Sequence, residues 1–168
     1  DLADARRLHN RLWGLPTWAT HNPAPTPCSL GRADLPLLRH GYVAAAKTDG
    51  ERATVVLGAL ERDPAVTYAV RFGRAGDTVR IGITASRVDG PGRLKGADPC
   101  EGTLLDCEWL ADQRRLVVLD AMALCGYDVK HVCNLHRRLD AARAVVRAVK
   151  LRDTAGNSVE IVFKPFVS

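Results

Sequence analysis

The 168-residue sequence has no long hydrophobic run, no closely spaced cysteine pair and few aromatic residues. No stretch approaches the ~20 apolar residues that cross a bilayer, and the N-terminus has no signal-peptide pattern, so no membrane span or secretion is expected. The five cysteines form no C-x-x-C pair, which favours reduced thiols in an intracellular protein over a disulfide scaffold. Hydrophobic residues still make up 46% of the chain, enough to bury a core in one domain.

Lysine is also scarce. Nineteen arginines accompany only five lysines, which are Lys47, Lys95, Lys130, Lys150 and Lys164. The net charge of +5 and the pI near 9.2 permit a polyanionic partner such as RNA or a nucleotide without requiring one. Arginine stays protonated in proteins, whereas lysine can lose its proton when it is buried or crowded by cations. A lysine within an informative motif is therefore a candidate for chemistry.

The hydrophobic patterns predict an α+β fold with mostly antiparallel strands and flanking helices. Apolar residues at helical spacing predict helices over residues 2–13 and 135–150, the second capped by Asn134. Short apolar runs predict strands over residues 42–46, 53–60, 66–72, 78–84, 103–110, 115–122 and 159–163. Because the helices stand near the two ends of the chain, an alternating βαβ array is not expected.

The segment Lys47-Thr-Asp-Gly-Glu-Arg52 has two interpretations. Asp-Gly between two apolar runs is a strong hairpin signal, and on that interpretation the flanking charges are only solvated. Alternatively, the segment matches a K-x-D-G-x-R nucleotide-attachment motif. A neutral Lys47 amine can attack an α-phosphate, Arg52 can hold a ribose or phosphate oxygen, and Gly50 lets the backbone turn beside a ligand.

The predicted hairpin of residues 103–122 places two carboxylates together. Asp106 and Glu108 are two residues apart on one strand, so their side chains share a face. A two-residue turn at Asp112-Gln113 would pair Asp106 with Leu119, while Asp120 would face away and support the fold. The alternative is that the two carboxylates only form the exposed polar face of the hairpin.

Several motifs occur in the order found in mRNA capping enzymes. The segments are Pro27–Leu38, Lys47–Arg52, Gly102–Glu108, Leu116–Met122 and Lys164-Pro-Phe166. Together they resemble the RNA guanylyltransferase family, of a viral type, within the covalent nucleotidyltransferases that also include ATP-dependent DNA and RNA ligases. The resemblance covers residues 23–166, and it implies a nucleotidyltransferase fold of antiparallel sheets beside a nucleotide cleft.

The resemblance also implies a reaction and a set of site residues. Lys47 would be the catalytic nucleophile that takes GMP from GTP and passes it to the 5′-diphosphate end of RNA. Mg²⁺ or Mn²⁺ would assist, with Glu108 and Asp106 as metal ligands. The implied nucleotide-binding residues are Thr48, Asp49, Arg52, Glu108, Leu119 and Lys164. Leu119 stands where the family usually has an aromatic residue that stacks on the base.

The resemblance further implies that residues 1–168 are part of a nucleotidyltransferase domain, because the family's fourth and fifth motifs and its OB-fold domain do not occur in the sequence. The implied partners are GTP, 5′-diphosphate RNA, and RNA triphosphatase and methyltransferase domains or subunits, with no membrane. The implied location is intracellular, in the nucleus or, for a viral protein, the cytoplasm or virion.

Two alternatives remain open from the sequence. An ATP-dependent polynucleotide ligase adenylation domain shares the K-x-D-G-x-R motif and an acidic third motif. A degenerate, non-catalytic nucleotidyltransferase-like module could instead act as a scaffold or bind RNA. Leu119 and the missing motifs favour the second alternative, whereas the retained set of Lys47, Asp49, Gly50, Arg52 and Glu108 counts against it.

Overall fold

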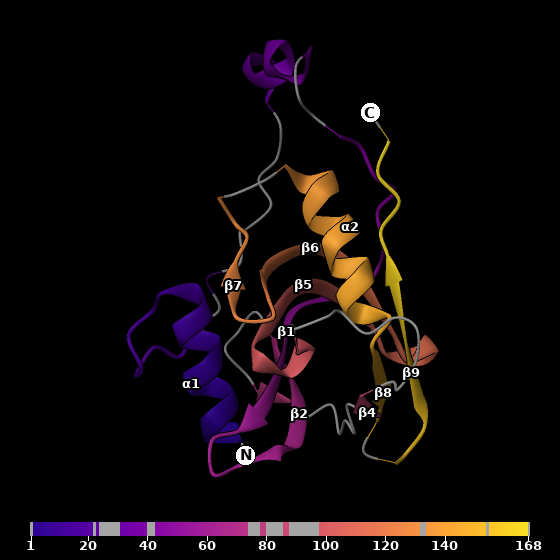
Figure 1. Ribbon diagram of the computed structural model, residues 1–168. Coiled ribbons are helices and arrows are strands. Elements are labelled where there is room, and N and C mark those ends of the chain that lie inside the picture. The colour runs from indigo at the N-terminus through magenta and orange to yellow at the C-terminus, as the bar shows by residue number, and fades with distance from the viewer. Residues whose placement is uncertain are drawn as a thin grey trace.

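The computed structural model describes residues 2–21, 23, 31–39, 43–73, 78–79, 86–87, 98–131, 134–153 and 155–167. Within them the chain forms a curled mixed sheet with two α-helices packed against it (Figure 1). The helices are α1 (Leu2–Trp13) and α2 (Leu135–Val146), and short 3₁₀ segments are η1 (Arg32–Arg39), η2 (Pro99–Glu101) and η3 (Ala111–Gln113). The predicted α+β class is confirmed at this level.

The sheet has the strand order β3-β2-β1-β5-β6-β9-β8-β4, with β7 paired to β6. The long strands are β1 (Glu51–Leu60), β2 (Asp63–Gly73), β5 (Thr103–Leu110), β6 (Arg115–Leu124) and β9 (Ser158–Phe163), and the short ones are β3 (Thr78–Val79), β4 (Ser86–Arg87), β7 (Tyr127–Asp128) and β8 (Val149–Arg152). The pairing of β6 with β9 is parallel, so the expectation of antiparallel sheets is wrong there. The chain returns through α2 and β8 before it enters β9, and such a crossover allows parallel neighbours.

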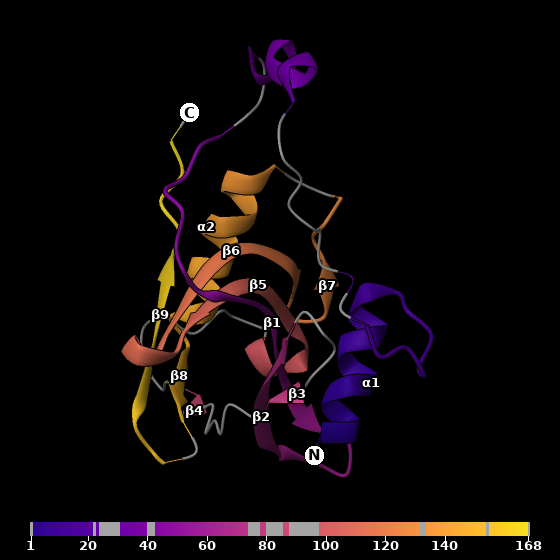
Figure 2. The same cartoon turned by 180° about the vertical axis from the view of Figure 1, so that it is seen from behind.

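Alternating residues of the strands form two hydrophobic clusters on opposite faces. Val55 and Leu57 of β1 pack in the cluster that includes α2, whereas Val56 packs with α1. The period of two along a strand separates these residues, since successive side chains point to opposite faces. Figures 1 and 2 show α1 and α2 lying against different parts of the sheet. Each helix therefore buries its apolar stripe against the sheet.

Most predicted elements occur, but the second helix ends earlier than predicted. The second helix begins after Asn134, whose side chain caps it by accepting from the Arg137 amide at 3.0 Å. It ends at Val146 instead of Lys150, because the following residues pair with β9 as strand β8. The apolar residues after Val146 fit either a helix or a strand, and pairing with β9 decides between the two. Of the predicted strand over 78–84, only residues 78–79 lie within the described residues.

The predicted strand over residues 42–46 and the Asp-Gly hairpin are both wrong. Residues 45–50 form no helix or strand, and Ala44 makes an isolated bridge with Val167 instead of pairing with β1. The partners of β1 are β2 and β5, which occupy both of its edges. A strand over 42–46 therefore has no free edge of β1 to pair with.

The β5–β6 hairpin is confirmed, and its predicted register holds at the Glu108–Val117 pair but not beyond Cys107. Its connection is the 3₁₀ turn η3, closed by Arg114 in the left-handed conformation at φ 48°. A β-bulge then makes Asp106 pair with Asp120 instead of Leu119. The extra residue of a bulge shifts every later pair by one position. The expectation that Asp120 faces away from Asp106 is therefore also wrong.

Asp120 nevertheless supports the fold as expected. Both of its carboxylate oxygens accept hydrogen bonds of 2.8 Å from Arg138, which ties β6 to α2. The structure describes Cys100, Cys107 and Cys125, and all three side chains are buried. No helix within the described residues is long and apolar enough to cross a membrane.

Candidate functional site

Lys47 lies on the irregular segment before β1 with its side chain in solvent. The side chain is 83% exposed, and its ammonium forms an ion pair with the equally exposed Asp49. This hydrogen bond raises the pKa of Lys47 above its ordinary value. A nucleophilic amine requires the opposite direction, so Lys47 is protonated at neutral pH in this arrangement.

A second lysine is buried beside the segment. The ammonium of Lys164 lies 3.1 Å from the hydroxyl of Thr48 and 3.4 Å from a carboxylate oxygen of Glu108. The side chains of Lys164 and Glu108 are only 10% and 16% exposed. Three residues from separate parts of the sequence, all implied by the resemblance, therefore meet here.

Arg52 and Asp106 form a second group on the same face of the sheet. The guanidinium donates to both carboxylate oxygens of Asp106, with the Nε to Oδ1 distance at 2.7 Å. Arg52 also stands directly opposite Glu108 in the β1–β5 register. Burial raises the pKa of Asp106 despite the opposing effect of Arg52. Arg52 therefore acts here first as the partner of a buried carboxylate.

Gly50 is required at its position because the backbone approaches β5 closely. A Cβ on Gly50 would lie 2.9 Å from the Cβ of Glu108 and 3.1 Å from the carbonyl oxygen of Trp109. Both contacts are tighter than ordinary van der Waals contact, and a carbonyl oxygen of a central strand cannot easily move. Gly50 therefore allows the backbone after Lys47 to pack directly against Glu108. The Asp-Gly pair does not form the hairpin turn of the alternative interpretation.

Asp106 and Glu108, the predicted metal ligands, are both engaged by cationic side chains. Both oxygens of Asp106 accept hydrogen bonds from Arg52, and one oxygen of Glu108 faces Lys164. A carboxylate oxygen can accept a hydrogen bond and bind a divalent ion at the same time, so the two residues stay predicted ligands. Among the described residues, no group of three or more His, Cys, Asp or Glu side chains is arranged to hold a metal ion.

Leu119 lies at the bulge in β6 and is not paired directly with a residue of β5. It is the residue that the bulge leaves between the pairs formed by Val118 and Asp120, and it is half-buried.

Of the segment expected to precede the attachment lysine, residues 27–30 lie outside the described residues, and η1 covers Arg32–Arg39. The structure thus brings together Thr48, Glu108 and Lys164, and Arg52 with Asp106, while Lys47 and Asp49 extend into solvent.

An open groove of about 560 Å³ lies beside the segment that carries Thr48 and Asp49. It is lined by Thr48, Asp49, Glu51, Trp109 and the 110–113 turn. Trp109 is a lining residue that the sequence analysis does not single out. It is the register partner of Glu51, and both point to the opposite face of the sheet from Arg52 and Glu108, where Trp109 packs against the hydrophobic cluster of α2.

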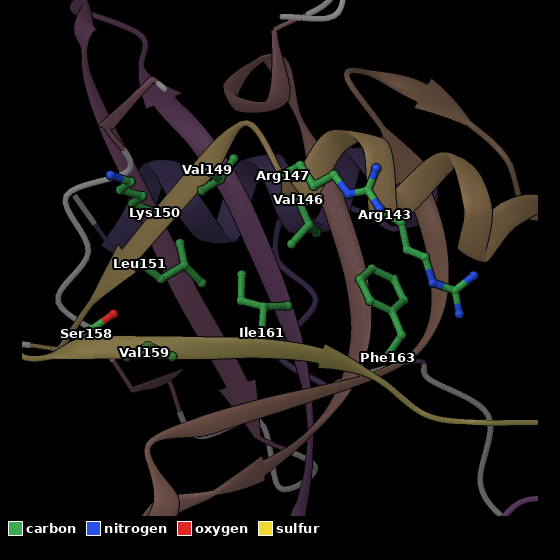
Figure 3. Close-up of a pocket in the computed structure, with 10 residues that line it drawn as sticks. All are labelled: Arg143, Val146, Arg147, Val149, Lys150, Leu151, Ser158, Val159, Ile161 and Phe163. Atoms are coloured by element: carbon green, nitrogen blue, oxygen red, sulfur yellow. The ribbon is translucent and has the colours of Figure 1, made fainter. Parts of the chain in front are cut away.

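A second groove, of about 520 Å³, lies between α2 and the strands β8 and β9. Figure 3 shows Val146 of α2 pointing toward Ile161 and Phe163 of β9, and the guanidinium of Arg143 lies 4.9 Å from the Phe163 ring centre. Phe163 and Lys164 are consecutive in an extended chain, so they point to opposite sides of it. This groove is therefore separate from the group formed by Thr48, Glu108 and Lys164.

Comparison with known proteins adds no family assignment, since no family model and no curated protein matches the chain. The motifs and their placement in this fold are therefore the basis on which a function is proposed.

The Arg52–Asp106 pair makes a testable contribution to stability. Replacing Arg52 by methionine leaves the Asp106 carboxylate, 3% exposed, without its ion-pair partner. We expect the free energy of unfolding at neutral pH to fall by about 3 kcal/mol, measured by urea denaturation. Adding Asp106→Asn to Arg52→Met should recover part of that loss, because the uncompensated charge is removed. Strictly additive losses would contradict this interpretation.

Proposed function

We propose that this chain carries the nucleotide-attachment site of an RNA guanylyltransferase. The observation that supports the proposal is the convergence of Thr48, Glu108 and Lys164, three residues from three separate motifs, beside the segment that carries Lys47. A chance match of short motifs gives no reason for their side chains to meet in space. A groove of about 560 Å³ lined by Thr48 and Asp49 lies beside the same segment.

In the proposed reaction, the Nζ of Lys47 attacks the α-phosphorus of GTP. A nitrogen–phosphorus bond forms, the bond to pyrophosphate breaks, and the amine loses its protons to solvent or phosphate. The terminal phosphate oxygen of 5′-diphosphate RNA then attacks the same phosphorus and releases the Lys47 amine. Before the first step the Lys47–Asp49 ion pair must open, because the paired ammonium has no lone pair to donate.

The other residues have binding roles in this proposal. Glu108 accepts a hydrogen bond from a ribose hydroxyl, and Lys164 contacts the edge of the base. Asp106 and Glu108 are the residues that would hold Mg²⁺ or Mn²⁺, which would neutralise the phosphates of GTP when bound.

Incubation of the protein with α-labelled GTP and Mg²⁺ tests the proposal. We expect a protein–GMP adduct that survives denaturing electrophoresis and is labile to acid, as a phosphoramide is. Labelling by ATP but not by GTP would assign the chain to the ligase type instead. If neither nucleotide labels the protein, the non-catalytic scaffold is the better interpretation and the proposal is wrong.

A further inference from the structure

The C-terminal residues of the described chain hold the segment that carries Lys47. The amide of Ala44 donates to the carbonyl of Val167 at 2.8 Å, and the Val167 amide donates back at 2.9 Å. Figures 1 and 2 both show the two segments side by side. Residues 45–50 lie between this bridge and β1 and belong to no helix or strand. Their placement therefore depends on contacts made by other parts of the protein.

Lys164 makes the main side-chain contact to this segment. Its own backbone is fixed by β6, since its amide donates to the carbonyl of Val118 at 2.9 Å. Its buried ammonium then reaches the Thr48 hydroxyl and the Glu108 carboxylate, at 3.1 and 3.4 Å. Thr48 directly follows Lys47, so the contact fixes the backbone beside the candidate nucleophile.

We propose that Lys164 is a positioning residue for Lys47. Glu108 holds the Lys164 ammonium by charge, and the ammonium in turn holds Thr48, so that the backbone of Lys47 is anchored from β5 and β9. The bridge at Ala44 anchors the same segment three residues earlier. The exposed Lys47 side chain can then swing from Asp49 to a bound phosphate while its Cα stays in place. The catalytic consequence rests on the proposed function, whereas the anchoring itself does not.

Cleavage by endoproteinase Lys-C measures the anchoring directly. The enzyme has only five candidate sites here, and cutting after Lys47 gives the distinct fragments 1–47 and 48–168. A protease requires a locally opened chain, so loss of an anchor accelerates cleavage. We expect Lys164→Met and Thr48→Val each to raise the rate at Lys47 by about tenfold or more, and the double variant to show no further increase. Peptides carrying Thr48 or Val at that position correct for the altered cleavage site.

Lys130→Met is the matched control for this experiment. Lys130 is also a mostly buried lysine with two partners, the carbonyl of Leu12 at 2.9 Å and the carboxylate of Asp128 at 3.1 Å. It anchors α1 instead of the Lys47 segment, so its loss should leave cleavage at Lys47 unchanged. Unchanged cleavage in folded Lys164→Met and Thr48→Val proteins would overturn the proposal. If Lys164→Met does not fold, unchanged cleavage in Thr48→Val alone overturns it.

Adduct formation with GTP tests the catalytic consequence. A positioning role predicts that both variants lower the maximal rate by about tenfold or more with little change in KM, and that their effects are not additive. A pure base contact by Lys164 would instead raise KM for GTP and would leave Thr48→Val unaffected, which would overturn the positioning role. If the wild-type protein forms no adduct but cleavage at Lys47 is accelerated in both variants, the proposed function fails and the anchoring stands.

Discussion

Replacing Lys47 by arginine is expected to abolish the protein–GMP adduct, with a loss of at least ~10³-fold in the rate of labelling. Arginine keeps the positive charge and the ion pair with Asp49, but it does not lose its proton and cannot attack phosphorus. Because the side chain is 83% exposed, the substitution should leave the free energy of unfolding unchanged. The measurement is incorporation of label from α-labelled GTP into folded protein.

The control for this experiment is Lys150→Arg, which changes an exposed lysine on β8. That variant should label at the wild-type rate. The reaction of the wild-type protein should also accelerate as the pH rises, because Asp49 raises the pKa of Lys47 and the amine reacts only when deprotonated. Labelling that persists in Lys47→Arg would place the nucleophile elsewhere and contradict the role given to Lys47.

Acidification from pH 6.5 to pH 4 is expected to remove about 3 kcal/mol of folding free energy through a single buried histidine. His9 on α1 is fully buried, with its ring nitrogens 3.0 Å from the side-chain oxygen of Asn10 and 3.3 Å from the hydroxyl of Thr54. Burial and the nearby charges of Arg6 and His21 together lower the pKa of His9 to about 4, against the hydrogen bond to the side-chain oxygen of Asn10.

The direction of the change in stability follows from which state of the protein, folded or unfolded, binds the proton. Between pH 6.5 and pH 4 the unfolded chain takes up a proton on His9 that the folded protein excludes, so the unfolded state is increasingly favoured as the pH falls. Urea denaturation at several pH values should show this loss. His9→Gln keeps hydrogen-bonding capacity but does not titrate, so its stability should decline by about 3 kcal/mol less over the same range.

The control here is His136→Gln, which removes an exposed histidine on α2. It should retain the wild-type pH dependence. Parallel stability curves for the wild-type and His9→Gln proteins would show that His9 does not carry the effect.

The local hydrophobic pattern was sufficient to predict most of the regular structure. The first helix matches residues 2–13, and the strands β1, β2, β5, β6 and β9 lie within about three residues of their predicted bounds. The periodicity of a helix or a strand is contained in the segment itself. The candidate site residues, by contrast, are implied by the resemblance of several short segments to one family.

Contacts between distant segments decided the rest. The stretch after residue 146 satisfies both helical and strand patterns, and only pairing with β9 makes residues 149–152 the strand β8. Likewise, Asp49-Gly50 is a good hairpin sequence, but both edges of β1 are already occupied by β2 and β5. The bulge that displaces Leu119 from Asp106 is a property of the β5–β6 pair and of neither strand alone.

The sequence by itself determined which residues are candidates for chemistry, an α+β class and the main elements, because each depends on local pattern. Only the tertiary structure decided how the candidates are arranged. Lys164 and Thr48 are 116 positions apart and Arg52 and Asp106 are 54 apart, yet each pair is in hydrogen-bond contact. Such contacts arise from sheet order and register, which short-range patterns do not specify. For that reason the sequence pointed to Lys47, and the fold brought Lys164 into contact with Thr48, the residue that follows it.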